Sequence, residues 1–96
     1  MLKHIVLFKF KPGTREEDIA DIEKGLATLP ERISEIKGYE FGRDMLRTDR
    51  SYDFALISEF EDQDAMKRYQ RHPYHFAVLN KINMVCESTI AVDYHF

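Results

Sequence analysis

The first strand that this sequence predicts is apolar on both of its sides, and that feature limits the folds open to the chain. One side of residues 2–10 carries Ile5, Leu7 and Lys9 and is apolar near its start. The other side carries mostly apolar residues: His4, Val6, Phe8 and Phe10. Successive side chains of a strand point to opposite faces, and a sheet with one face in water would show a polar residue at every second position. The strand therefore needs cover on both faces.

A helix is predicted to follow the first strand. A Pro-Gly turn at residues 12–13 precedes Thr14, which with Glu17 three residues later has the pattern of a capping box. Apolar residues then recur at spacings of three and four, which places them on one stripe facing a core: Ile19, Ile22, Leu26 and Leu29. Pro30 is expected to end the helix, and Gly25 within it indicates close packing against a neighbour.

The rest of the chain predicts a hairpin, a broken helix and a last strand. Residues 38–45 give a weak strand signal, and residues 54–60 alternate clearly. Asp62 is a suitable N-cap for the next helix, whose inner stripe is Ala65, Met66 and Tyr69. Pro73 starts a second helical segment with its own stripe: His75, Val78, Leu79 and Ile82. The last strand alternates over residues 89–96, so the order is βαββαβ and all 96 residues form one α+β domain.

Helices in this order cross on one side of the sheet, so its other face is predicted to be bare. That face is predicted to present an apolar patch: Ile5, Leu7, Ala55, Ile57 and Ala91. Hiding even ~500 Å² per subunit, at about 25 cal/mol per Å², is worth on the order of 10 kcal/mol before association costs. A homodimer that pairs sheet to sheet is therefore expected. The alternative is a lone domain whose face Lys9, Glu40 and Glu59 keep polar enough for water.

Composition limits which partners and which cellular compartment are expected for the chain. Hydrophobic residues make up 44% of the chain and charged residues 32%, as in soluble globular proteins. The formal net charge of -3 offers no basic field for a phosphate backbone, so nucleic acid is not an expected partner. Lys9 and Lys11 interrupt the apolar N-terminal run, so no membrane association is expected. Cys86 is the only cysteine, and a cytoplasmic location is expected.

Three polar side chains are predicted to point inward and to meet: His4, Tyr69 and His75. Apolar residues of the same strand and helix faces would line a small pocket around them: Val6, Phe8, Leu56 and Leu79. A histidine can remove or deliver a proton near neutral pH, and a buried tyrosine hydroxyl can donate to a developing oxyanion. The set suits proton transfer on, or cyclisation of, an enolisable substrate. The alternative is that the histidines are hydrogen-bonded core residues and that Tyr69 only fills space.

Other kinds of chemistry find no support in the sequence. It contains no Gly-rich phosphate loop, no nucleophile elbow and no Cys or His spacing typical of a zinc site. A metal site among the four histidines is not expected, because Pro73 breaks the helical spacing between His72 and His75, and no cofactor is expected. His72 is instead expected to cap the C-terminal end of its helix as a cation.

Four segments carry a resemblance to a known family: His4-Ile5-Val6-Leu7-Phe8-Lys9-Phe10-Lys11, Tyr52-Asp53-Phe54-Ala55-Leu56, Tyr69-Gln70-Arg71-His72-Pro73-Tyr74-His75 and Val92-Asp93-Tyr94. The chain resembles the stress-responsive A/B barrel (Dabb) family over nearly all of its length. The resemblance implies a ferredoxin-like subunit with a four-stranded antiparallel sheet, and a dimer whose two sheets form an α+β barrel. The family includes a plant polyketide cyclase, whose acid–base tyrosine and histidine would map onto Tyr69 and His75, with His4 nearby.

Two residues depart from the cyclase pattern. Tyr74 stands where the cyclase has a small residue, and Phe8 is bulky on the strand face that would line the pocket, so the sequence leaves open whether the cavity is filled. The leading hypothesis is a cytoplasmic homodimer that binds or transforms a small enolisable metabolite, with His75 as general base and Tyr69 as donor. The alternatives are a non-enzymatic stress-associated dimer and a cofactor-free monooxygenase or isomerase on the same barrel.

Overall fold

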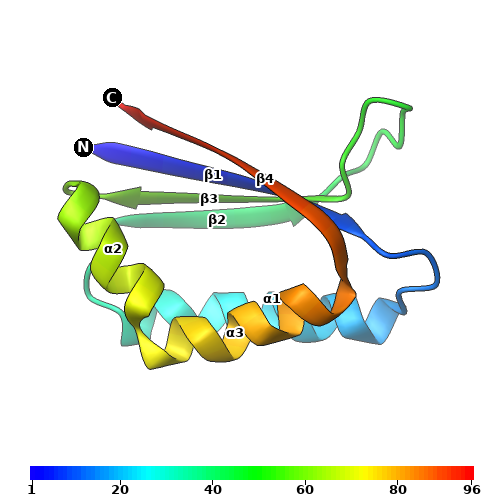
Figure 1. The fold of residues 1–96 in the computed structure, drawn as a ribbon, viewed down its shortest axis with the longest axis horizontal. Helices are drawn as coiled ribbons and strands as arrows, with labels where there is room; N and C mark the ends of the chain where they lie inside the picture. The colour runs from blue at the N-terminus through cyan, green and yellow to red at the C-terminus, as the bar shows by residue number, and fades with distance from the viewer.

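The computed structural model describes residues 1–96 and shows one antiparallel sheet with helices on a single face (Figure 1). The elements follow the predicted order: β1 Leu2–Phe10, α1 Glu16–Arg32, β2 Gly38–Arg43, β3 Phe54–Phe60, α2 Gln63–Arg71, α3 Pro73–Val85 and β4 Cys86–His95. The strand order across the sheet is β2-β3-β1-β4. This is the ferredoxin-like α+β arrangement that the sequence predicts.

The central strand β1 pairs on both of its sides, and its register decides which side chains share a face. Val6 lies opposite Leu56 of β3 and opposite Ala91 of β4. Because directly paired residues of antiparallel strands point to the same face, Ala91 lies on the helix side with Val6 and Leu56. The prediction that Ala91 belongs to the uncovered face is therefore wrong.

The uncovered face of the sheet, called the open face below, is more apolar than predicted. Ile5 pairs with Ile57 and Val92, and Leu7 pairs with Ala55 and Ile90. The apolar residues of the open face come from β1, β3 and β4: Ile5, Leu7, Ala55, Ile57, Ile90, Val92 and Tyr94. Charged residues of the same rows lie around them: Lys3, Lys9, Glu40 and Glu59. The β4 members are 49%, 62% and 43% exposed in the order Ile90, Val92, Tyr94.

No helix of the structure combines the length and the apolar character needed to cross a membrane.

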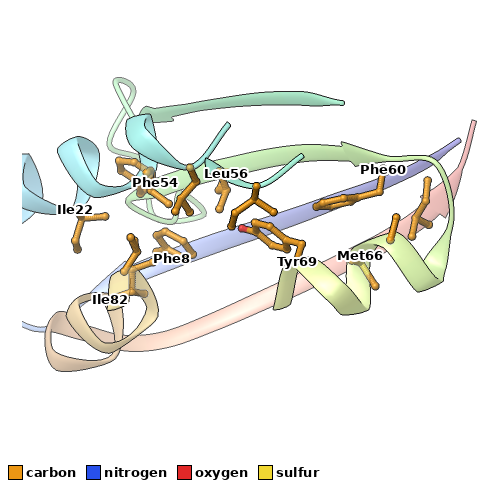
Figure 2. Packing of buried hydrophobic residues seen from close by; sticks show 14 residues of the cluster. Phe8, Ile22, Phe54, Leu56, Phe60, Met66, Tyr69 and Ile82 are labelled. Carbon is orange, nitrogen blue, oxygen red and sulfur yellow. The ribbon is translucent and has the colours of Figure 1, made fainter. Parts of the chain in front are cut away.

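The core lies between the other face of the sheet and the helices (Figure 2). Phe8 of β1 stacks on Phe54 of β3, with ring centroids 5.4 Å apart and the planes 5° from parallel. Helix α1 contributes its predicted stripe, of which Ile22, Leu26 and Leu29 are buried. At Gly25 an added Cβ would meet a methyl carbon of Val78 at 3.1 Å, so the close packing predicted there is against α3.

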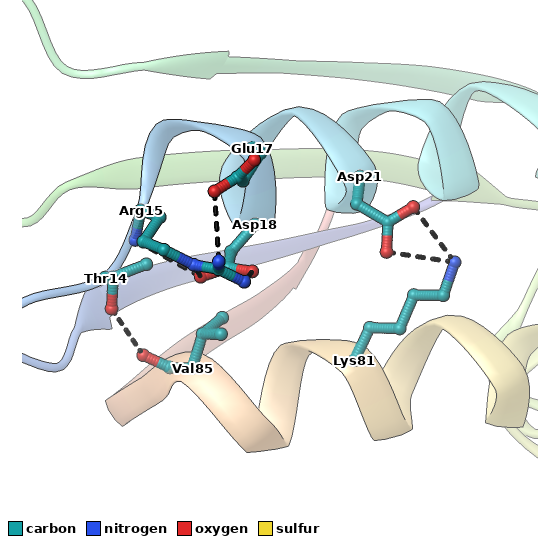
Figure 3. A network of polar contacts seen from close by, with 7 residues as sticks. All are labelled: Thr14, Arg15, Glu17, Asp18, Asp21, Lys81 and Val85. Carbon is teal, nitrogen blue, oxygen red and sulfur yellow. Dashed lines mark hydrogen bonds and ion pairs between the residues drawn. The ribbon is translucent and has the colours of Figure 1, made fainter.

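The first turn of α1 begins one residue later than predicted (Figure 3). Arg15, not Thr14, is the N-cap, and the Asp18 carboxylate accepts a hydrogen bond from the Arg15 backbone N–H at 3.2 Å. The Thr14 hydroxyl instead donates to the Lys11 carbonyl oxygen at 2.7 Å. Lys81 of α3 forms an ion pair with Asp21 and ties the two helices together.

The helix α1 also continues beyond Pro30, contrary to the prediction that it ends there. The helix runs to Arg32, and the Ile33 backbone N–H donates to the Leu29 carbonyl at 2.9 Å. A proline in the last turn removes one donor, and the complete burial of Ile33 holds the chain in place after it. The weak strand signal at Met45 is likewise wrong, since β2 ends at Arg43 and Met45 is 84% exposed.

The break between α2 and α3 follows the prediction except at His72. Asp62 caps α2 by accepting from the Ala65 backbone N–H at 2.8 Å, and Pro73 is the first residue of α3. His72 is the C-cap residue of α2, as predicted, and its backbone N–H donates to the Tyr69 carbonyl oxygen at 3.1 Å. Its side chain does not bind the last carbonyls of α2, contrary to the prediction: Nδ1 accepts a hydrogen bond from the Tyr74 backbone N–H at 3.2 Å and so caps the start of α3.

Candidate functional site

A pocket of about 270 Å³ lies between the helix side of the sheet and the helices α2 and α3. It is called the sheet–helix pocket below and is lined by His4, Val6, Phe8, Leu56, Tyr69, Gln70, His75, Leu79, Ile82, Asn83 and Thr89. All seven residues that the sequence predicts for the site are among them. The structure thus brings together residues from β1, β3, α2 and α3 that are distant in the chain. None of the lining residues is a lysine, arginine, aspartate or glutamate.

His75 is held by a backbone carbonyl at the start of α3. Its Nδ1 lies 3.1 Å from the Gln70 carbonyl oxygen. A carbonyl oxygen can only accept, so Nδ1 carries the proton and the neutral ring keeps a free lone pair on Nε2. Burial lowers the pKa of His75 below its ordinary value of 6.5. The hydrogen bond to Gln70 raises the pKa, and the nearby His4 and His72 lower it by smaller amounts. The side chain is therefore an uncharged base at neutral pH.

Tyr69 is fixed by aromatic neighbours on several sides. Its ring centroid is 4.5 Å from that of His75 and 4.9 Å from that of Phe60, and the residue is 2% exposed. Its hydroxyl oxygen lies 3.0 Å from the hydroxyl oxygen of Tyr39 on β2. Burial raises the pKa of Tyr69, so the hydroxyl is a hydrogen-bond donor at neutral pH. Figure 2 shows the Tyr69 hydroxyl inside the core, among side chains of the sheet.

His4 reaches the pocket from β1 and is paired with a carboxylate. Its Nδ1 is in short contact with Oδ1 of Asp93, the residue opposite it on β4. The His4 side chain is 12% exposed and the Asp93 side chain 41%. A carboxylate accepts from the ring N–H, which fixes the ring orientation and leaves Nε2 of a neutral His4 as an acceptor.

The two residues that could have filled the pocket do not fill it. Phe8 is 2% exposed and turns into the stack with Phe54, so its ring forms only part of the pocket wall. Tyr74 points away, because its ring stacks on His72 and lies under the Arg32 guanidinium at 4.5 Å. The bulk of these side chains therefore leaves the cavity open.

Sequence reasoning missed several polar residues around the pocket. Tyr39 lies in the weakest strand signal, and its contact with Tyr69 depends on how α2 crosses β2. Asp93 could have been found, because it is the acidic residue in a row of β4 that faces the helices and lies opposite His4. Gln70, Asn83 and Thr89 carry no pattern in the sequence that separates them from surface residues. No group of three His, Cys, Asp or Glu side chains is placed to bind a metal ion together.

A larger hollow of about 360 Å³ lies between the β1–α1 turn and the loop after β2. Four of its five charged side chains pair with one another or with α1, and Lys11 donates to the Met84 carbonyl oxygen of α3 at 3.2 Å. Arg47 contacts Asp53 at 2.7 Å, and Arg43 contacts Glu16 at 2.6 Å. Asp53 also accepts from the Phe10 backbone N–H at 2.7 Å. These contacts brace the loop against the sheet, so the smaller sheet–helix pocket is the better candidate site.

The Stress responsive A/B Barrel Domain (Dabb) family matches residues 2–96. The chain belongs to this family. The stress-response A/B barrel domain-containing protein At5g22580 of Arabidopsis thaliana is 30% identical to it over 97 residues, which cover 96% of this chain and 83% of the relative. A dimeric ferredoxin-like protein of unknown function from Thermobifida fusca superposes with a TM-score of 0.91 at 30% identity, covering 99% of this chain and 90% of that one.

A second similar structure is an enzyme by name. Hydroxynitrile lyase from Passiflora edulis superposes with a TM-score of 0.85 over 97% of this Dabb chain and 90% of its own, at 21% identity. At that identity the likeness shows a common fold and nothing about the reaction.

Proposed function

We propose that the sheet–helix pocket binds a small, uncharged, enolisable metabolite and moves a proton on it without a cofactor. The single observation that carries this proposal is the placement of His75 and Tyr69 on one pocket wall, with ring centroids 4.5 Å apart. The absence of charged lining residues favours an uncharged ligand, since a carboxylate or phosphate would lose its hydration without gaining a cationic partner.

The proposed chemistry uses one base and one donor. His75 Nε2 takes a proton from the carbon beside the ligand's carbonyl group, and the electron pair of the broken C–H bond moves onto the carbonyl oxygen. The Tyr69 hydroxyl donates a hydrogen bond to that oxygen as its charge develops. Return of the proton to another atom would give an isomerase reaction, and attack of the enolate carbon within the same molecule would give a cyclase reaction. Departure of a leaving group from the carbon next to the enolate, with the proton from His75, would give a lyase reaction. Because burial lowers the pKa of His75, the base is available at and below neutral pH.

The proposal includes a homodimer formed through the open face, in the cytoplasm. Ile90 and Val92, on the edge strand β4, are 49% and 62% exposed and extend the apolar surface of the sheet. The loop between β2 and β3 rises on that same side of the sheet (Figure 1) and exposes Leu46 to 72%. A second copy covering both surfaces would hide apolar area from water, and the similar Thermobifida fusca protein is dimeric.

One observation favours the alternative, a non-enzymatic stress-associated dimer. His75 already has a hydrogen-bond partner in the Gln70 carbonyl, as a histidine with a purely structural role would have. In that case His75→Leu should be tolerated or stabilising. A cofactor-free monooxygenase or isomerase on the same barrel remains an analogy of fold, which oxygen consumption with candidate quinols would test.

Ligand binding distinguishes an acid–base site from inert packing. The probe is phenylacetone, an uncharged enolisable ketone, titrated into isotope-labelled protein and followed by NMR. We expect shifts at pocket residues, and a several-fold loss of affinity in Tyr69→Phe and in His75→Ala. The control Tyr74→Phe, on the outer side of α3, should bind as the wild type does. Unchanged affinity in both pocket variants would remove the basis of the proposal.

A further inference from the structure

A second tyrosine lies behind the proposed donor. Tyr39 of β2 places its hydroxyl oxygen 3.0 Å from that of Tyr69, and the two rings meet edge to face with centroids 6.3 Å apart. Tyr39 is not among the residues that line the sheet–helix pocket, whereas Tyr69 is. A ligand in the pocket can therefore contact Tyr69 but not Tyr39.

The direction of this hydrogen bond decides what Tyr69 can do. A tyrosine hydroxyl has one proton to donate and can also accept. If Tyr69 donates to Tyr39, it has no proton left for a ligand oxygen. If Tyr39 donates to Tyr69, the Tyr69 proton remains available on the pocket side. Phe60 and His75 pack against the Tyr69 ring at 4.9 Å and 4.5 Å and hold the hydroxyl in place for either case.

We propose that Tyr39 is a positioning residue that donates its hydroxyl proton to the Tyr69 oxygen and so directs the Tyr69 proton toward the ligand. The inference rests on the proposed function of the sheet–helix pocket and deepens it. It makes the donor of the site a chain of two hydroxyl groups, of which only the second touches the ligand.

The chain of hydroxyls strengthens the donor when negative charge develops. As the ligand oxygen becomes an oxyanion, it draws the Tyr69 proton, the Tyr69 oxygen becomes a better acceptor, and the bond from Tyr39 tightens with it. In the free protein burial raises the pKa of both tyrosines, so both hydroxyls keep their protons at neutral pH and one of them donates across the 3.0 Å contact. The other titratable side chains at this site are His75 of α3 and His4 of β1.

The first test needs no ligand. All five tyrosines are replaced by 3-fluorotyrosine, which titrates at lower pH, and each fluorine signal is followed by NMR as the pH rises. In Tyr39→Phe, which keeps the ring and loses the hydroxyl, we expect the titration midpoint of residue 69 to rise. Tyr52→Phe is the matched control, since Tyr52 packs near Lys9 on another part of the sheet, and it should leave that midpoint unchanged. An unchanged or lower midpoint in Tyr39→Phe would mean that Tyr69 is the donor of the pair and would overturn the inference.

The second test is a double-mutant cycle on binding of p-nitrophenol, whose phenolate oxygen stands in for the oxyanion that develops on the uncharged ligand and whose visible absorbance reports binding. Loss of one hydrogen bond should weaken binding of the phenolate roughly three- to tenfold in Tyr39→Phe. The same change in a Tyr69→Phe background should have no effect, because Tyr39 acts only through Tyr69. Equal losses in both backgrounds would indicate a merely structural role and contradict the inference.

The two tests separate failure of the inference from failure of the proposed function. If the pocket binds neither phenylacetone nor p-nitrophenol, the proposed function fails, and the ligand-free titration still decides which tyrosine donates. If both probes bind and the titration midpoint of residue 69 does not rise in Tyr39→Phe, the pocket function stands and the role of Tyr39 is refuted.

Discussion

The burial that keeps the His75 ring uncharged for the proposed chemistry also makes the stability of the domain depend on pH. Above pH 6.5 the side chain is neutral in both the folded and the unfolded chain and adds nothing to the pH dependence of stability. Below pH 6.5 the unfolded chain binds the proton first, since the pKa of His75 is lowered only in the folded state. The free energy of unfolding should therefore fall as the pH drops through this range.

Replacing His75 by leucine should remove this acid sensitivity. We expect the free energy of unfolding in urea to fall less between pH 7.5 and pH 5 in His75→Leu than in the wild type, as about one ionisation fewer is linked to unfolding. Asn80→Leu, an exposed change on the same helix, should keep the wild-type pH dependence. The same fall in both variants would show that His75 is not buried as a neutral ring.

At the residue scale the sequence predicted which side chains gather but not how they are oriented. The three–four spacing of α3 and the alternation of β1 were enough to send His75 and His4 to the same side of the sheet. The partners that set their tautomers, the Gln70 carbonyl and the Asp93 carboxylate, depend on backbone positions that no side-chain period encodes. The sequence could not predict the open cavity beside Phe8 either, since the cavity depends on how the Phe8 ring stacks on Phe54.

At the scale of single elements, the sequence predicted the N-cap of α2 correctly and that of α1 wrongly. Asp62 at the start of α2 was predicted, and its carboxylate accepts the expected backbone donor. Thr14 was assigned the same role at α1, but its hydroxyl found a carbonyl in the preceding turn. Both residue types favour caps, and the choice between adjacent positions depends on the path by which the chain enters the helix.

Packing between elements explains why α1 continues beyond its proline. A proline in the sequence is a good signal for the end of a helix, yet α1 continues from Pro30 to Arg32. Ile33, which follows, is completely buried, and its backbone still donates to Leu29. Tertiary burial here outweighs the local cost, in the same way that Gly25 is used for contact with Val78 at some cost in helix propensity.

At the scale of the whole molecule, the open face leads to a prediction about assembly. Wild-type protein should sediment as a dimer at micromolar concentration. Val92→Asp places a charge on the open face beside Ile5, where Val92 is 62% exposed in the single subunit, and should yield monomers. Met84→Asp, a control on α3 where Met84 is 75% exposed, should remain dimeric. A monomeric wild type, or a dimer that Val92→Asp leaves intact, would show that the sheet does not pair in this way.

The central claim is that the sheet–helix pocket removes a proton from an enolisable ligand. The most direct measurement follows phenylacetone in D₂O at neutral pH by NMR, since each proton abstraction at the carbon beside the carbonyl lets deuterium enter. Wild-type protein should exchange these hydrogens at least tenfold faster than His75→Ala at equal concentration, as expected for the loss of a general base. Exchange at the same rate with wild type, with His75→Ala and in buffer alone would contradict the claim.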